Sequence, residues 1–219
     1  MEFKHNTDAI LFDLDGTLWD SVDEILFAWN RVILSHPGVR EPISRAEQES
    51  CMGMQMDDLA DRIFPGHPPA LRHELMQECM QAENRYLWEH GGRLYPELEA
   101  VLERLHTSYR LFIVSNCQSG YIEAFLHAHS LAPFFSGYLC FGDTGLSKCE
   151  NITRIVRDNR LRHPIYVGDT QLDRDAARSA SIPFVYAAYG FGTVSDHDGV
   201  IATVSDLLGL FPCSGAVSK

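Results

Sequence analysis

The sequence contains no apolar run of the roughly 20 residues that a helix needs to cross a membrane. Its first residues, Met1 to Asn6, also lack the apolar stretch of a secretory signal peptide. Six cysteines are scattered without a C-x-x-C pair, so we interpret them as reduced thiols. We therefore expect a cytoplasmic protein with no membrane partner.

Positive charge is also scarce, because only three lysines accompany 15 arginines and the formal net charge is -12 at pH 7. Nucleic acids are bound mostly through Lys and Arg contacts to phosphate, so a nucleic-acid partner is disfavoured. Hydrophobic residues make up 45% and charged residues 22%, which is ordinary for a folded globular chain. The length of 219 residues suits one core that carries an inserted piece.

Short continuous apolar runs recur along the chain, and such runs are typical of strands buried on both faces of a parallel sheet. From Tyr95 onward, amphipathic patterns at helical spacing alternate with these runs. The alternation predicts an α/β fold with a doubly wound parallel sheet. The predicted strands lie at residues 9–12, 111–114, 138–141, 165–167 and 184–187.

The segment after the first strand has a different pattern, with no convincing strand. Apolar residues at helical spacing run from Val22 to Ile33, and a second helix is predicted to begin near Pro68. Gly91 and Gly92 then supply a pliable joint, so the helical segment could move as a lid. The predicted domains are a core of residues 1–18 plus 93–219 and an inserted helical cap of residues 19–92.

Two carboxylates follow the first predicted strand. Asp13 and Asp15 are two residues apart and project to the same side, while Leu14 between them points to the core. Ligands of open α/β sheets bind at these strand ends. Because two close carboxylates repel each other, their pairing favours a bound cation or a protonated carboxyl. The plain alternative is a turn at Asp15-Gly16 with no further role.

A second acidic cluster follows the predicted strand at residues 165–167. Asp169 stands at the strand end, and Asp173 lies in the first turn of the next helix. Oxygen ligands from two strand ends suit Mg²⁺. An aspartate at position 173 has two equally good explanations. It stabilises the helix through the helix dipole, or it supports the metal ligands.

Groups suited to phosphate are expected at the same edge of the sheet. Ser115 and Asn116 follow another strand and offer a hydroxyl and backbone N–H groups, although a capping serine is the ordinary alternative. Lys148 stands out because the other two lysines, Lys4 and Lys219, lie near the termini. Its point charge suits a phosphoryl group beside carboxylates, and a solvated surface lysine is the alternative.

The order of these motifs resembles the haloacid dehalogenase superfamily, and within it the branch that is similar to phosphoglycolate phosphatases. The resemblance spans nearly the whole chain and implies an α/β core of that family with an inserted cap. The matching motifs are D-x-D-G-T-L at residues 13–18, Ser115, Lys148 and G-D-T-x-x-D at residues 168–173.

The resemblance implies a magnesium-dependent phosphatase that hydrolyses a small phosphorylated metabolite, either phosphoglycolate-like or a sugar phosphate, through an aspartyl phosphate. Asp13 would be the nucleophile and Asp15 the general acid and base. Phosphate would be bound by Ser115, Asn116 and Lys148. Magnesium would be bound by the side chains of Asp13 and Asp169 and the backbone carbonyl of Asp15, with Asp173 in support.

Neighbouring branches of the superfamily fit less well. Asp15 favours phosphate transfer over dehalogenation, because a leaving halide needs no proton and the dehalogenase branch lacks this residue. The branch that cleaves phosphonoacetaldehyde needs a cap lysine, and residues 5–147 contain none. One departure from the phosphatase branch remains, since Cys149 follows Lys148 where that branch usually has proline.

Two alternatives of function stay open. A sugar-phosphate phosphomutase similar to beta-phosphoglucomutase has the same fold and would return the phosphate to a bound intermediate. A phospho-accepting signalling receiver domain is the alternative outside the enzymes, but it has its acceptor Asp on the third strand and no long helical insert.

The substrate itself is not legible from the sequence. Arg45, Arg72 and Arg85 could meet a second anionic group, although solvated helix faces are their ordinary explanation. We expect a small phosphorylated metabolite as the partner, and a chain that is a monomer or a weak homodimer.

Overall fold

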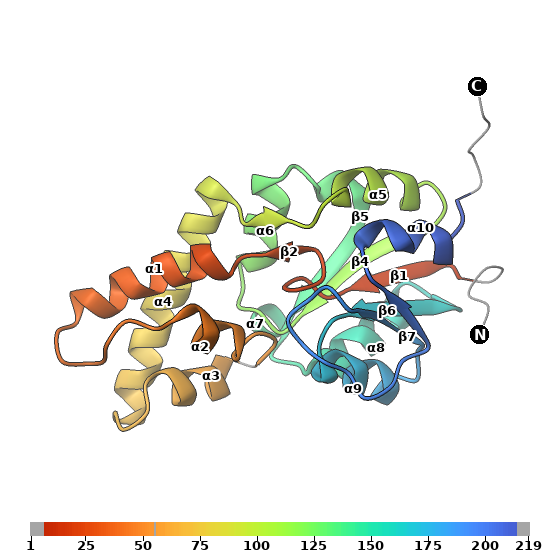
Figure 1. The fold of residues 1–219 in the computed structure, drawn as a ribbon. Helices are drawn as coiled ribbons and strands as arrows, with labels where there is room; N and C mark the ends of the chain where they lie inside the picture. Colours follow the sequence, from red (N-terminus) through yellow and green to blue (C-terminus); the bar gives the residue numbers. More distant parts are fainter. Residues whose placement is uncertain (1–6, 55, 214–219) are drawn as a thin grey trace.

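The computed structural model describes residues 7–54 and 56–213, except for the side chains of residues 56 and 57, and it shows a parallel sheet from which a group of helices projects (Figure 1). The strand order is β5-β4-β1-β6-β7-β8, and every neighbouring pair is parallel. The predicted doubly wound α/β fold is confirmed. The strands are β1 (Ala9–Phe12), β4 (Arg110–Ser115), β5 (Phe135–Cys140), β6 (Pro164–Gly168), β7 (Phe184–Ala187) and β8 (Gly199–Ile201).

Both faces of the sheet are covered because its strands are apolar on both sides. In β1, Ile10 and Phe12 belong to one hydrophobic cluster, whereas Ala9 and Leu11 belong to a second cluster on the opposite face. The second cluster packs against α8 (Lys148–Asp158) and α9 (Gln171–Ser179). The remaining helices of this part are α5 (Leu98–Leu105), α6 (Tyr121–Ala128), α7 (Phe141–Thr144), α10 (Leu207–Leu210) and two 3-10 turns at Ala132–Phe134 and Val204–Asp206.

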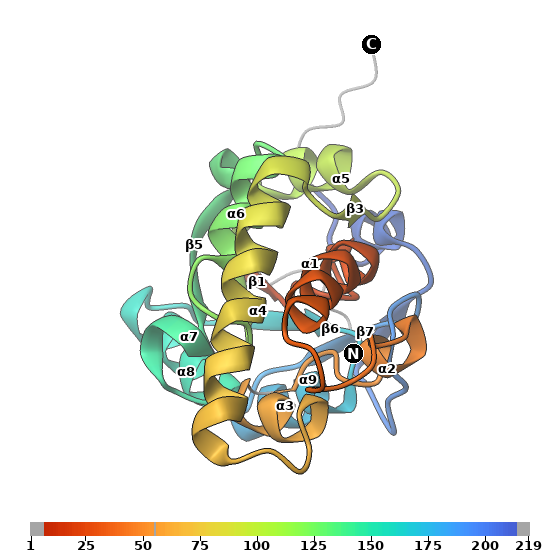
Figure 2. The same ribbon diagram turned by 90° about the vertical axis from the view of Figure 1, so that its left-hand side faces the viewer.

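Of the helices between β1 and β4, α1 to α4 form an insert that projects away from the sheet (Figures 1 and 2). The long helix α4 packs along α1, with Trp29 of α1 and Leu75 and Cys79 of α4 buried. The α4 helix begins at Pro69, where a residue without an N–H group costs no helical hydrogen bond. The insert helices are α1 (Val22–Ser35), α2 (Arg45–Glu49), α3 (Met56–Ile63) and α4 (Pro69–His90).

The expectation that residues 19–92 contain no strand is wrong. Trp19–Asp20 forms β2, which pairs antiparallel with β3 (Arg93–Leu94), so a short ribbon joins the two ends of the insert. Across this ribbon, Nη2 of Arg93 donates to Oδ2 of Asp20 at 2.5 Å. Strands of two residues are too short to have an alternating pattern.

Other parts of the sheet also differ from the predictions. The edge strand β8 has only three residues and was not predicted. The run at residues 138–141 belongs to a strand that ends at Cys140, and Phe141 already begins α7. Edge strands and short helices give weak sequence patterns, because fewer of their residues are buried.

No helix within the described ranges is long and apolar enough to span a membrane. All six cysteines are free, and four of them are buried. The cysteines therefore contribute apolar packing, as small buried thiols generally do.

Candidate active site

Three neighbouring strands end at one polar site. The central strand β1 lies between β4 and β6, and the ends of these three strands lead to Asp13, Ser115 and Asp169. The strand order reverses beside β1, which is where open α/β sheets bind ligands. The fold thus brings together the motifs that the sequence placed at strand ends.

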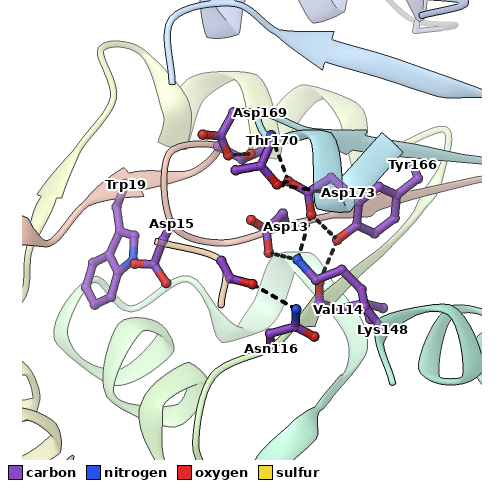
Figure 3. Close-up of polar contacts among 12 residues, drawn as sticks. Asp13, Asp15, Trp19, Val114, Asn116, Lys148, Tyr166, Asp169, Thr170 and Asp173 are labelled. Carbon is purple, nitrogen blue, oxygen red and sulfur yellow. Dashed lines mark hydrogen bonds and ion pairs between the residues drawn. The ribbon is translucent and has the colours of Figure 1, made fainter. Parts of the chain in front are cut away.

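Lys148 forms two ion pairs at the centre of this site. Its Nζ donates to Oδ1 of Asp13 at 2.8 Å and to Oδ1 of Asp173 at 2.6 Å (Figure 3). The lysine side chain is 4% exposed, and the two aspartate side chains are 3% and 0% exposed. Lys148 is therefore no solvated surface lysine, and one ammonium group faces two buried carboxylates.

Asp169 is fully buried, and each of its oxygens accepts a hydrogen bond. Thr17 Oγ1 donates to Oδ1 at 3.2 Å, and the backbone N–H of Phe191 donates to Oδ2 at 2.8 Å. One oxygen each of Asp13, Asp169 and Asp173 lies within 4.8 Å of the others. Carboxylate oxygens at this spacing fit a hard divalent cation such as Mg²⁺.

Asp173 differs from Asp13 and Asp169 because it is held by Lys148 on one oxygen and by the start of the next helix on the other. Its Oδ1 pairs with Lys148, and its Oδ2 accepts from the N–H and the hydroxyl of Thr170 at 3.0 and 2.7 Å. The hydrogen bonds between Thr170 and Asp173 form the capping box at the start of α9. These contacts fit a residue that holds Lys148 and the helix start, with Asp13 and Asp169 left as the better metal ligands.

Crowding of acids changes the protonation of the site. Burial raises the pKa of Asp13, and the nearby Asp173 raises it further, whereas Lys148 lowers it. Burial also raises the pKa of Asp169, followed by the charges of Asp173 and Asp13. The cluster therefore favours either protonation or a bound cation, as the paired carboxylates in the sequence predicted.

Asp15 is held by three hydrogen bonds to one oxygen. Trp19 Nε1, Ser21 Oγ and Tyr121 OH donate to Oδ1 at 2.9, 2.8 and 2.7 Å. Burial raises the pKa of Asp15, and the donors, led by Tyr121, oppose that shift. None of these three partners was predicted from the sequence. Trp19 and Ser21 could have been noticed by their closeness to Asp15 in the chain, but Tyr121 gives no such signal.

Two glycines allow loops to pack against Asp169. A Cβ atom on Gly16 would lie 2.3 Å from Oδ2 of Asp169, and one on Gly190 would lie 2.3 Å from its Cβ. Gly16 also has a φ of 79°, a conformation that favours glycine. The glycine of the D-x-D-G motif is therefore required both for its backbone conformation and for its close approach to Asp169.

Ser115 and Asn116 line the same cavity as Asp13 and Asp15. The Asn116 side chain donates from Nδ2 to the backbone oxygen of Gly53 at 2.9 Å, so it contacts the insert (Figure 3). The helix that follows, α6, begins only at Tyr121. The Ser115 hydroxyl and the backbone N–H groups of the turn are thus the groups here that could hold an anion, without a helix start directly at Ser115.

The cavity of about 40 Å³ lies between the sheet end and the insert. Its insert side includes Trp29, Gln48 and Glu83, which the sequence did not single out. Glu83 is 3% exposed, and Trp29 Nε1 donates to its Oε2 at 2.5 Å. An acidic residue within a helix usually faces solvent, so its burial could not be read from the sequence.

The three arginines considered as substrate ligands do not line this cavity. Arg45 pairs with Asp20, Asp23 and Glu49, and Arg72 pairs with Asp61. Arg85 lines a separate groove between α1 and α4. Arg45 and Arg72 are therefore paired with acidic residues, and Arg85 lies in a different groove.

The fold and the site define an α/β protein in which aspartates at strand ends surround one buried lysine. The sequence signature described as "Haloacid dehalogenase-like hydrolase" matches residues 10–187. The chain belongs to this family of hydrolases.

Known proteins resemble the chain over most of its length. It is 32% identical over 196 residues to a phosphoglycolate phosphatase of Aliivibrio fischeri, with 83% of this chain and 84% of that protein covered. It is 27% identical over 220 residues to a phosphoglycolate phosphatase of Vibrio parahaemolyticus, with 91% and 93% covered. A haloacid dehalogenase-like hydrolase from Streptococcus pneumoniae has the same fold, with a TM-score of 0.79 at 22% identity and with 93% and 97% of the chains covered.

Proposed function

We propose that the chain hydrolyses a small phosphorylated metabolite in the presence of Mg²⁺, by passing the phosphoryl group through Asp13. As a member of its family with relatives named phosphoglycolate phosphatase, it is a phosphoric monoester hydrolase. The single observation that supports the route through Asp13 is its burial beside Lys148 and Asp169 at the end of the central strand.

In the first step, a carboxylate oxygen of Asp13 attacks phosphorus while the ester P–O bond breaks. The leaving oxygen takes a proton from Asp15. The raised pKa of Asp15 favours its protonated form before this step. The alcohol departs, and the phosphoryl group stays on Asp13 as an acyl phosphate.

In the second step, the ionised Asp15 accepts a proton from a water molecule whose oxygen attacks the same phosphorus. The bond between phosphorus and Asp13 breaks, so inorganic phosphate and the free carboxylate form. Asp15 thereby regains the proton that it gave in the first step, and the cycle closes.

Binding of the phosphate is assigned to the Ser115 hydroxyl, the backbone N–H of Asn116 and the Lys148 ammonium group. Asp13 and Asp169 would bind Mg²⁺ with their side chains, and Asp15 with its backbone carbonyl. The bound ion would supply positive charge that reduces the repulsion between a carboxylate nucleophile and an anionic ester. Asp173 is assigned to hold Lys148 in place.

Residues 19–92 are proposed to act as a cap over a core formed by residues 1–18 and 93–219. The cavity of about 40 Å³ has room for about three water molecules, so an ester would enter when the insert moves. The β2–β3 ribbon and the φ of 70° at Gly91 favour a joint at this end of the insert.

The test is hydrolysis of p-nitrophenyl phosphate by the purified chain, with excess EDTA and then with excess Mg²⁺. We expect activity only with Mg²⁺, and a phosphorylated protein after rapid acid quench. Asp13→Asn should remove both signals, whereas Asp175→Asn, the same change at an exposed acid of α9, should retain them. Steady-state turnover by Asp13→Asn, or full turnover in EDTA, would contradict the proposal.

A further inference from the structure

The polar groups on the insert side of the cavity indicate which leaving group it accepts. Glu83 of α4 and Gln48 of α2 line the cavity, and each is 3% exposed. Asn116 lines it from the end of β4. A leaving group would meet these side chains once its phosphoryl group is bound as proposed above.

Gln48, Glu83 and Asn116 together form the polar wall of the cavity. Two amide oxygens of this wall are buried without a hydrogen-bond partner, namely Oε1 of Gln48 and Oδ1 of Asn116. The Asn116 amide is fixed from its other end, because Nδ2 donates to the backbone oxygen of Gly53. Buried polar atoms are normally paired, so these two oxygens indicate a ligand that supplies hydrogen-bond donors.

Basic residues are missing from the wall. The described residues that line the cavity include the carboxyl groups of Asp13, Asp15 and Glu83, but no lysine, arginine or histidine. Lys148 is already paired with Asp13 and Asp173. A carboxylate on the leaving group would therefore be buried next to Glu83 without a cation, which is unfavourable.

A hydroxyl group fits the same wall because it both donates and accepts hydrogen bonds. It can donate to the unpaired oxygens of Gln48 and Asn116, and it can pair with Glu83 in either protonation state. It also suits the Gln48 amide in either orientation of its oxygen and nitrogen. A carboxylate, which only accepts, satisfies neither unpaired oxygen.

We propose, resting on the phosphatase function above, that the substrate is the phosphate ester of a small uncharged polyol, whose hydroxyl groups bind Gln48, Glu83 and Asn116. This wall then discriminates against phosphoglycolate, the ester for which the curated relatives are named. Specificity would follow from hydroxyl groups that pair with buried polar atoms and from a carboxylate that finds no basic partner.

The test compares kcat/KM with Mg²⁺ for four esters: p-nitrophenyl phosphate, glycerol phosphate, phosphoglycolate and phosphoethanolamine. We expect glycerol phosphate to exceed phosphoglycolate by at least about tenfold, and phosphoethanolamine not to exceed glycerol phosphate. Gln48→Arg adds a cation to the wall and should shift the ratio toward phosphoglycolate by about tenfold or more. Gln48→Met, of similar length without charge, should lower the value for glycerol phosphate and leave phosphoglycolate poor.

Glu83→Gln gives a second measurement that does not depend on a large new side chain. Above the raised pKa of Glu83, this change removes a negative charge but keeps a donor and an acceptor, so the discrimination against phosphoglycolate should decrease while glycerol phosphate remains a substrate. Turnover of the aryl ester without a preference for glycerol phosphate overturns this inference alone, and so does a preference for phosphoethanolamine. Failure to hydrolyse any ester, the aryl phosphate included, overturns the proposed function and this inference with it.

Discussion

The hydroxyl of Tyr121 donates a hydrogen bond of 2.7 Å to Oδ1 of Asp15, across 106 residues of sequence. Trp19 and Ser21 donate to the same oxygen, so in the proposed mechanism Oδ2 would carry the proton of Asp15. The three donors together hold the carboxyl group in one orientation.

Removal of the Tyr121 hydroxyl is expected to change the pH dependence of turnover. The hydroxyl lowers the pKa of Asp15, so Tyr121→Phe should raise that pKa and leave the base of the second step protonated up to higher pH. A hydrogen bond to a charged group contributes about 1.5–3 kcal/mol, so the acidic limb of the kcat profile should move up by about one pH unit or more. Tyr109→Phe is the matched control, since its hydroxyl donates to the backbone oxygen of Pro212, away from Asp15. An unchanged profile in Tyr121→Phe would show that Tyr121 contributes packing and does not control the pKa of Asp15.

Asp15→Asn should separate substrates by their leaving groups. An alkyl phosphate needs a proton on its leaving oxygen, so its turnover should fall by about 10² to 10⁴, while phosphorylation by a nitrophenyl ester should fall much less. Hydrolysis of the acyl phosphate should slow for both esters, so phosphorylated protein should accumulate in acid-quenched samples. Equal slowing of phosphorylation for both esters would show that Asp15 does not transfer the proton.

Lys148→Met should destabilise the metal-free protein, because Asp13 and Asp173 then remain buried without their common cation. Breaking a buried ion pair costs about 3–5 kcal/mol in the free energy of unfolding. This loss should be full at about pH 8 and smaller at about pH 5, because burial raises the pKa of Asp13 and so permits its protonation at the lower pH. Urea denaturation of the variant at both pH values checks this, with Arg154→Met on the same helix as the exposed control. An equal loss at both pH values would contradict the electrostatic explanation.

Glu83 should make the folded protein less stable as the pH rises. Burial raises its pKa to about 8 from an ordinary value of 4.5, Asp15 adds to this, and hydrogen bonds from Trp29 and Gln118 oppose it. The folded state therefore binds more protons than the unfolded state between these two values, so stability declines across this window, by up to about 1.4 kcal/mol per pH unit. Urea denaturation in EDTA should show a flatter pH dependence for Glu83→Gln than for the native chain. The exposed Glu89→Gln on the same helix should leave the slope unchanged, and equal slopes for all three proteins would refute the assignment.

The sequence was informative wherever burial produced a pattern over several residues. The strands of residues 9–12 and 184–187 were predicted with their observed limits, because apolar runs buried on both faces are easy to recognise. The ribbon of β2 and β3 was missed because each strand is only two residues long.

Within the site, the residues that could be predicted were those whose chemistry suits a ligand site at the ends of the strands. Asp13, Asp169 and Lys148 were expected to converge, and the structure brings them together. Tyr121 and Glu83 were missed for a different reason. Their significance depends on which distant residue lies opposite, and local patterning carries no information about such contacts.

The β2–β3 ribbon has an evolutionary consequence. The chain leaves the core at Trp19 and returns at Leu94, and these two residues are paired neighbours in the ribbon. A different stretch of chain could be grafted between the same two points without rerouting any strand of the six-stranded sheet. The chain between these two points can therefore vary in length and sequence while the six-stranded sheet and the residues at its strand ends stay the same.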